Sequence, residues 1–221
     1  MKTNGKAPSS NQSRERRNRY DEIIQAALGI FAEKGYAATS VQDVADAVGV
    51  LKGSLYHYID SKEDLLFHIF DDAHVEAEKL MAEVDNLDAD PIEKLRFYLE
   101  TSVRRTLENL PLQNLYFRDW RYLTGDRRDK LAERRRQYDR YLRSLIVRAL
   151  EAAGLESSMN IRFVSSFVIG GTNWVADWYR ADGPDSADEV AHSYAHLAMS
   201  AIMGTATFER ASGQVTKGRS R

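Results

Sequence analysis

Apolar residues recur three and four positions apart along almost the whole chain, and no segment alternates apolar and polar residues for long. This spacing places apolar side chains on one face of an α-helix, whereas a half-buried β-strand needs a period of two. Gly and Pro are sparse inside the periodic segments. The sequence therefore predicts an all-α protein.

The first helix is predicted from an apolar stripe that begins at Ile23 and ends at Phe31. Gly35 follows, and glycine readily takes the left-handed conformation that closes many helices. The folded body is expected to begin near Arg14. Residues 1–13 form a polar arm that buries too little surface to offset the entropy cost of ordering, so disorder is expected there.

Two short helices are predicted next. Ser40 and Asp43 are spaced as an approximate capping box at the start of one helix, and Gly49 ends it. The other is predicted from Lys52 to Ile59. A short helix, a turn that contains glycine and a second short helix form the unit that inserts its second helix into the DNA major groove. We therefore expect a three-helix, helix-turn-helix DNA-binding domain over residues 14–60.

The remaining helices are expected to form a larger domain over residues 61–210, followed by a disordered tail at 211–221. A proline at a first helical turn and glycines after helix ends mark several of the boundaries. The predicted helices cover 62–84, a segment that begins at Pro91, a segment between Gly125 and Gly154, 158–179 and 186–208. Pro111 marks a further boundary.

The composition narrows the class of protein. The chain has 221 residues, of which 43% are hydrophobic and 29% charged, so it can bury a real core. It contains no cysteine, which excludes disulfides, thiolate catalysis and cysteine-ligated metal centres. No apolar run is long enough for a membrane span, and the polar start lacks the apolar core of a secretory signal. We expect a cytoplasmic protein without a membrane partner.

The charge is distributed unevenly. Residues 1–20 contain Lys2, Lys6, Arg14, Arg16, Arg17 and Arg19 against Glu15. Their net charge is +5, and because the whole chain has −2, the remainder has −7. A basic arm on an acidic body suits contact with a polyanion at one end only, with Arg16 and Arg17 as candidate DNA contacts. A solvated tail without a partner explains the same composition equally well.

The predicted third helix carries side chains that suit nucleic-acid contact. Lys52, Ser54, Tyr56 and His57 offer hydrogen-bond donors and an aromatic hydroxyl, while Leu55 and Ile59 are expected to face inward. Gly53 lies inside this helix, where glycine costs about 1 kcal/mol relative to alanine. Close approach of the backbone to DNA would account for that cost.

The same stretch resembles a known family. The first predicted helix contains ALGIFAEKGY, and the run from Thr39 to Leu66 reads TSVQDVADAVGVLKGSLYHYIDSKEDLL, which is similar to the DNA-binding signature of TetR-type transcriptional regulators. The resemblance implies phosphate contacts from Thr39, Ser40, Tyr56, His57 and Lys62. Leu51 departs from the pattern, because the family often has a Ser or Thr cap there. The recognition helix would then have a weaker N-terminal cap, or residue 51 would read a different operator position.

The resemblance also implies a homodimer, since one recognition helix covers only a few base pairs and two are needed for specific binding. In the family the last two helices pair with those of a second copy. The residues expected at that interface are Ala191, Tyr194, Ala195, Ala198, Ala201 and Ile202. Packing within one copy is the alternative for this face.

An effector pocket is expected among the middle helices, which are rich in aromatic residues. The candidate ligand contacts are Tyr98, Phe117, Trp120, Tyr138, Gly170 and Trp174. The segment from Thr172 to Pro184 resembles actinobacterial TetR regulators of lipid and steroid breakdown, some of which sense acyl-CoA thioesters. That resemblance implies an acyl-CoA or other lipid-like effector, and a neutral hydrophobic molecule stays open as the alternative.

Other functions have less support. No nucleophile elbow, phosphate-binding loop or dinucleotide fingerprint is present, so an enzyme is not expected and no cofactor is predicted. His192 and His196 are spaced four apart but lack a third ligand at metal spacing, so no metal site is predicted. The resemblance favours a repressor released from a palindromic operator. A transcriptional activator on the same fold and a non-DNA-binding helical adaptor remain as alternatives.

Overall fold

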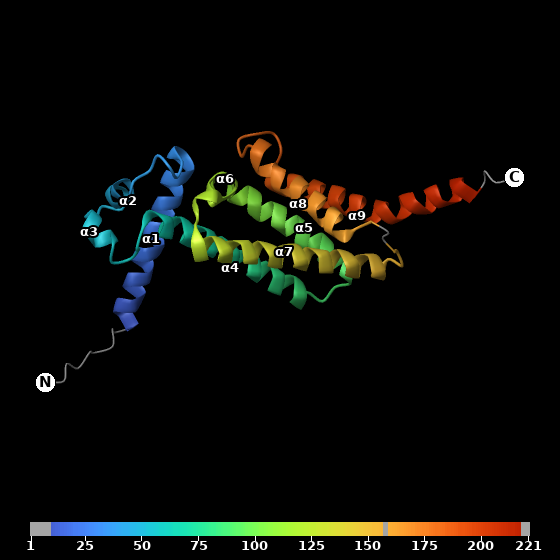
Figure 1. Ribbon diagram of the computed structural model, residues 1–221, viewed down its shortest axis with the longest axis horizontal. Helices are drawn as coiled ribbons and strands as arrows, with labels where there is room; N and C mark the ends of the chain where they lie inside the picture. Colours follow the sequence, from blue (N-terminus) through green and yellow to red (C-terminus); the bar gives the residue numbers. More distant parts are fainter. Residues whose placement is uncertain (1–9, 157–158, 218–221) are drawn as a thin grey trace. The chain divides into compact units, whose positions relative to one another are not determined.

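The computed structural model describes residues 10–156 and 159–217, and within these residues every regular element is a helix (Figure 1). The all-α prediction is therefore confirmed. In chain order the elements are α1 (Ser10–Lys34), α2 (Val41–Ala47), α3 (Lys52–Leu55), α4 (Lys62–Asn86), α5 (Pro91–Glu108), α6 (Leu110–Asp119), the 3₁₀ turn η1 (Trp120–Tyr122), α7 (Gly125–Ala152), α8 (Ile161–Trp178) and α9 (Ala187–Lys217). None of the helices in these ranges is long and apolar enough to cross a bilayer.

Helix boundaries agree with the sequence wherever a specific residue ends the helix. Gly35 and Gly154 have positive φ angles of 85° and 65° and close α1 and α7 as expected. The two outer ends differ from expectation, since α1 begins at Ser10 and α9 extends to Lys217. A helix that is already nucleated adds polar residues at little cost, so composition alone does not end it. The parts of the expected disordered segments at 1–9 and 218–221 lie outside the described residues.

The chain forms two compact units, and the first is discontinuous in sequence. It contains the residues up to Asp72 together with Asn114–Arg128. Its buried apolar side chains come from α1 to α4, from the loops between them and from the inserted segment: Ile23, Ile24, Ala27, Leu28, Phe31, Tyr36, Val44, Ala45, Leu55, Ile59, Leu65, Leu66, Ile69, Phe70, Leu115 and Leu123. The unit is thus larger than the expected domain at residues 14–60, because the start of α4 and the segment 114–128 supply part of its core.

The second unit contains Ala73–Gln113 and the chain from Asp129 onward. Helices α5, α8 and α9 pack side by side in it (Figure 1). Their main core is formed by Leu80, Val84, Leu95, Leu99, Leu142, Leu145, Ile146, Ala149, Leu150, Val164, Val168, Ala195, Ala198 and Ile202. The small residues of α9 allow α5 to approach closely, and among the helix pairs of the described residues this pair has the most extensive contact.

This packing places most of the expected dimer face inside one copy. Of the six residues assigned to it, Ala191, Ala195, Ala198 and Ile202 are buried inside the core of one copy. Tyr194 and Ala201 are half-buried, and the Tyr194 hydroxyl accepts a hydrogen bond from Trp178 Nε1 at 3.1 Å. The sequence pattern identified the apolar face of α9 correctly. It could not reveal that α5 already covers that face.

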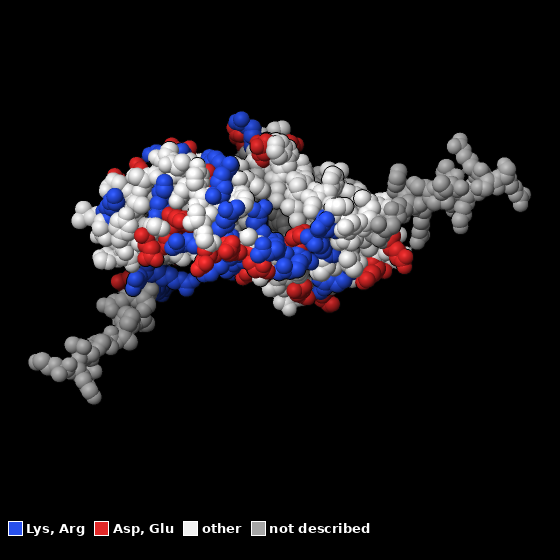
Figure 2. All heavy atoms as spheres, in the orientation of Figure 1, with Lys and Arg blue, Asp and Glu red and all other residues white. Residues whose placement is uncertain are grey.

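A different apolar surface is open to solvent. Phe163, Phe167, Trp174 and Trp178 of α8 are 59%, 71%, 62% and 40% exposed. They are spaced four, seven and four residues apart, with Gly170 and Gly171 in the interval of seven, so all lie on one face of the helix. No charged residue occurs between Arg162 and Asp177, and the surface over this part of α8 is largely uncharged (Figure 2).

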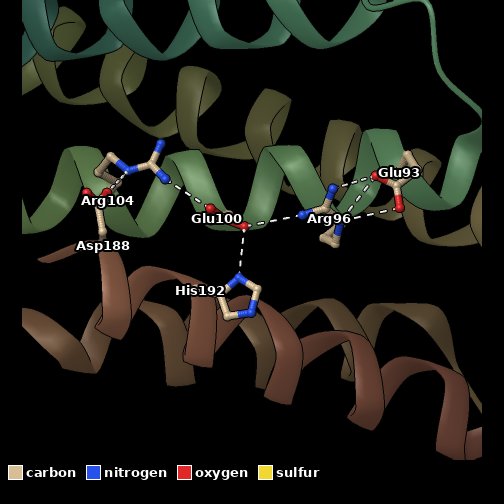
Figure 3. Close-up of polar contacts among 6 residues, drawn as sticks. All are labelled: Glu93, Arg96, Glu100, Arg104, Asp188 and His192. Carbon is tan, nitrogen blue, oxygen red and sulfur yellow. Dashed lines mark hydrogen bonds and ion pairs between the residues drawn. The ribbon is translucent and has the colours of Figure 1, made fainter.

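Ion pairs join the outer edges of α5 and α9 (Figure 3). Glu100 lies at their centre, where its carboxylate accepts a hydrogen bond from Arg104 at 2.9 Å and lies 3.5 Å from Arg96 and 3.6 Å from His192. Arg104 also donates to Asp188 at 2.6 Å. Exposed pairs of this kind contribute about 0–1 kcal/mol each. Their main effect is to specify which turn of α9 faces which turn of α5.

Candidate nucleic-acid interface

The start of α2 is fixed by a capping box. Ser40 Oγ accepts a hydrogen bond from the Asp43 amide at 3.2 Å, and the Asp43 carboxylate accepts from the Ser40 amide at 2.7 Å. The hydrogen bond from the Ser40 side chain lowers the pKa of Asp43 below its ordinary value. The predicted cap is confirmed. The exposed Ser40 side chain therefore has a fixed position at the end of the helix.

The turn between α2 and α3 depends on Gly49, whose φ of 68° is unfavourable for residues with a side chain. The amide of Val50 donates back to Ala45 O at 3.0 Å, which closes the turn. Leu51 then begins α3 without any side-chain capping bond, as its departure from the family pattern predicted. The glycine turn and the cap of α2 together hold the two helices of the predicted helix-turn-helix.

Helix α3 ends at Leu55, before the predicted end at Ile59, and the residues after it form a turn. Helix and turn together have an inner and an outer face. Leu55 and Ile59 are buried in the first unit, as predicted. The predicted DNA contacts Lys52, Gly53, Tyr56 and His57 are exposed, and Ser54 is half-buried. Donors and an aromatic hydroxyl thus share one accessible surface, supported from beneath by the core.

The basic residues of α1 adjoin this surface. Arg16 Nη2 donates to the His57 carbonyl at 3.2 Å, and Arg17 is exposed on the same helix. Arg16 and Arg17 line a hollow with Tyr20 and Tyr58. The basic segment at the start of the chain is therefore helical from Ser10. Its two candidate DNA contacts, Arg16 and Arg17, lie beside the end of α3.

Two residues expected to hold phosphate have internal partners instead. Thr39 is 3% exposed, and its hydroxyl donates to Gly35 O at 2.9 Å. Lys62 Nζ donates to the carbonyls of Tyr36 and Thr39 at 2.9 and 2.8 Å and lies 4.2 Å from the centre of the Tyr36 ring. Burial lowers the pKa of Lys62 below its ordinary value. Both side chains stabilise the link between α1 and α2, and a phosphate contact from either stays a prediction.

Sequence reasoning missed the contribution of residues 114–128 to this unit. Asp119 is 4% exposed, and its Oδ2 accepts hydrogen bonds from the Tyr36 amide at 3.2 Å and from Arg118 Nε at 3.0 Å. Arg118 also donates to Phe31 O at 2.8 Å, at the end of α1. These contacts join residues more than eighty positions apart. No local spacing rule predicts these contacts. The signal available in the sequence was an acidic residue at the end of a largely apolar helix.

A second set of contacts ties the same segment to the start of α4. Glu63 accepts hydrogen bonds from the amide and the hydroxyl of Thr124 at 2.8 and 3.1 Å. Arg127 Nη2 donates to Asp64 Oδ1 at 2.8 Å, and Asp64 is largely buried. The segment is therefore held by specific polar contacts as well as by its buried leucines.

The six expected ligand contacts are divided between the two units. Phe117 and Trp120 belong to the first unit, and Gly170 and Trp174 lie on the exposed face of α8. Only the two tyrosines, at 98 and 138, lie within the second unit's interior packing. Tyr98 meets Tyr141 edge to face at 5.5 Å, and Tyr138 stacks on His74 at 5.2 Å. Helical periodicity located the aromatic residues but did not separate exposed from enclosed ones.

Comparison with known proteins identifies the family. Residues 23–69 match the pattern of bacterial regulatory proteins of the tetR family, and residues 88–202 match that of the tetracyclin repressor-like C-terminal domain. The chain belongs to the TetR family. It is therefore a transcriptional regulator and not an enzyme, as the sequence predicted.

The similarity to individual TetR proteins covers most of the chain. The HTH-type transcriptional repressor KstR2 of Mycobacterium tuberculosis is 27% identical over 188 residues, which cover 84% of this chain and 93% of the relative. The structure of the TetR regulator PfmR from Thermus thermophilus is 34% identical, covers 80% of this chain and 96% of PfmR, and gives a TM-score of 0.73. The structure of KstR2, described as a ketosteroid transcriptional regulator, is 25% identical, covers 82% of this chain and 93% of its own, and gives a TM-score of 0.74.

Proposed function

We propose that the protein is a cytoplasmic homodimeric repressor that binds a palindromic operator and leaves it when a lipid-like metabolite binds the second unit. The observation that carries the proposal is the exposed face of α3, where Lys52, Gly53, Tyr56 and His57 lie over a buried core and beside Arg16. Side chains that contact phosphate fix the position of a protein on DNA, and those that reach base edges select the sequence. The α3 face offers both kinds.

Sequencing of genomic fragments retained by the purified protein tests DNA binding and identifies the operator. Tyr56→Phe removes one hydroxyl from the exposed face, and we expect it to weaken binding to all operator variants by a similar factor, because phosphate contacts do not read bases. Tyr122→Phe is the matched control, since Tyr122 is similarly exposed in the same unit but outside α3. Losses that differ strongly between operator variants would contradict a phosphate role for Tyr56.

The exposed face of α8 supports the homodimer. A large aromatic side chain has about 150–250 Å² of surface, so the exposed parts of Phe163, Phe167, Trp174 and Trp178 amount to about 900 Å² in a symmetric pair. Specific interfaces bury about 1,000 Å² or more, so these four side chains alone supply most of the area that a dimer needs. A palindromic operator also requires two copies related by a two-fold axis.

The paired glycines support the same assignment. Gly170 and Gly171 are exposed inside α8, and a Cβ added to either would meet nothing within 4 Å. The single copy therefore gives no steric reason for two residues that cost about 1 kcal/mol each in a helix. Close approach of a helix from a second copy would give a steric reason for the two glycines. We accordingly move these glycines and Trp174 from the effector site to the dimer interface.

Sedimentation of Phe167→Glu tests this interface. We expect the variant to be a folded monomer, because the two-fold axis would place two unpaired carboxylates in an apolar contact. Val147→Glu is the control, since Val147 is an exposed apolar residue of α7 away from this face. A Phe167→Glu protein that sediments like the wild-type dimer would exclude α8 from the interface.

The effector is proposed to be an acyl-CoA thioester or a related lipid-like molecule. Support comes from the similarity to KstR2 and from the aromatic packing of the second unit. We propose contacts from Tyr98 and Tyr138. Tyr138 is held by two short contacts with His74, one from its hydroxyl to the His74 carbonyl and one with Nδ1, both 2.9 Å long.

Calorimetric titration with palmitoyl-CoA and with a neutral steroid enone distinguishes the two effector classes. Binding of the thioester alone supports an acyl-CoA effector, whereas binding of the steroid alone supports a neutral hydrophobic molecule. Tyr138→Phe removes the hydroxyl that holds the ring against His74, so we expect binding of the active compound to weaken by up to about tenfold, the value of one lost hydrogen bond. Tyr122→Phe, in the first unit, serves again as control. Equal affinities of the two variants would remove Tyr138 from the site.

A further inference from the structure

Leu51 has a position that neither packing nor capping explains. It is 80% exposed, the most exposed of the large hydrophobic side chains in the described residues. It directly precedes α3 with an extended backbone and makes no side-chain hydrogen bond to the helix. Leucine is also among the poorest residues for capping a helix. The protein itself therefore gains nothing from an apolar side chain at this position.

The two residues that follow Leu51 belong to the exposed α3 face. Lys52 and Gly53 follow it and are exposed, and a Cβ at Gly53 would meet nothing within 4 Å. The surface consequently offers an apolar group, then a cation, then a position without a side chain. Such a low profile permits close approach of a large partner to Leu51 and Lys52 together.

The chemistry of DNA restricts what an apolar group can recognise on this face. Base edges in the major groove present hydrogen-bond donors and acceptors, and the C5-methyl of thymine is their one apolar group. We propose that Leu51 contacts a thymine methyl in each operator half-site and thereby selects thymine over cytosine at that position. This inference rests on the proposed binding of operator DNA by α3.

Replacement of thymine by uracil provides a direct test, because uracil keeps the base pair and lacks only the methyl group. The probe is a duplex that the wild-type protein selects from a random-sequence pool, synthesised with deoxyuridine at each thymine in turn. We expect one thymine in each half-site at which uracil weakens wild-type binding about fourfold, the factor expected for one buried methyl group. Leu51→Ala should bind more weakly and should be insensitive to uracil at that position.

Two further variants make the result specific. Leu51→Met keeps an apolar contact and should keep the uracil response, whereas Lys52→Ala should weaken binding but leave the response intact. Because Leu51 is exposed, all three variants should melt like the wild type. Failure of the wild type to select any duplex would overturn the proposed function and this inference together. Selection of a duplex without a uracil-sensitive thymine, or full uracil sensitivity in Leu51→Ala, would overturn the inference alone.

Discussion

Asp119→Ala should destabilise the first unit although residue 119 lies far along the chain from the helix-turn-helix. The Asp119 carboxylate accepts a hydrogen bond from the amide of Tyr36, which is itself buried. Without an acceptor that amide costs about 1–3 kcal/mol. Arg118 loses its partner too, but its side chain is 45% exposed and water can replace the contact, so that part is about 0–1 kcal/mol. We expect a total loss of about 1–4 kcal/mol in the free energy of unfolding.

Urea unfolding of the full chain, followed by circular dichroism, measures this loss. Asp119→Asn keeps one carbonyl oxygen and should lose about 1 kcal/mol, roughly the charge-assisted part of the contact. Asp126→Ala is the control, because Asp126 is an exposed acid of the same segment and should change stability by less than about 0.5 kcal/mol. If Asp119→Ala were as stable as the control, the contact with Tyr36 would contribute nothing to the unit.

Four further outcomes follow from the structure. Burial, with Arg134 and Arg135 nearby, lowers the pKa of His74 from 6.5 to about 4, so between these pH values the unfolded chain binds a proton that the folded chain does not. The contribution to stability should be complete above pH 6.5 and fall by about 3 kcal/mol toward pH 4. A pH series of urea midpoints should therefore be flatter for His74→Asn than for the wild type. Lys52→Ala should reduce the salt slope of operator binding by about one unit, whereas Lys62→Ala should mainly lower the melting temperature and leave the slope nearly unchanged; the reverse pattern would restore Lys62 as a phosphate contact. Ala198→Arg should unfold the second unit rather than produce a folded monomer, because Ala198 is 7% exposed within one copy, and sedimentation with circular dichroism separates these results. Saturating operator should weaken effector binding in calorimetry by the same factor as effector weakens operator binding, typically 5- to 150-fold, and unequal factors would show that the assays measure different equilibria.

The sequence predicted those features that depend on nearby residues. The Ser40–Asp43 capping box, the glycine turns and the inward-facing Leu55 and Ile59 are local or periodic, and all are present. The helix boundaries that lack a stop residue were less predictable, as the extension of α9 to Lys217 illustrates.

Features that depend on distant partners were not predictable in the same way. The small residues of α9 correctly indicated close helix packing, but only the structure identifies α5 as the partner of Ala195 and Ala198. The aromatic face of α8 has the same period as a core-facing helix, so periodicity could not mark Trp174 as exposed. The sequence around Lys62 is similarly that of a phosphate contact in the family, whereas in the structure its Nζ donates to two backbone carbonyls of the first unit.

The discontinuous first unit has a consequence for how regulators of this kind can be recombined. A gene fusion cut after residue 60 or 72 would leave behind Asp119, Thr124 and Arg127, whose partners are Tyr36, Glu63 and Asp64. An exchange of the second unit must therefore replace two separate stretches, 73–113 and 129 onward, while residues 114–128 of the original protein are kept. A new effector specificity should then be transplanted as a double graft, and single-crossover chimaeras should express as poorly folded proteins.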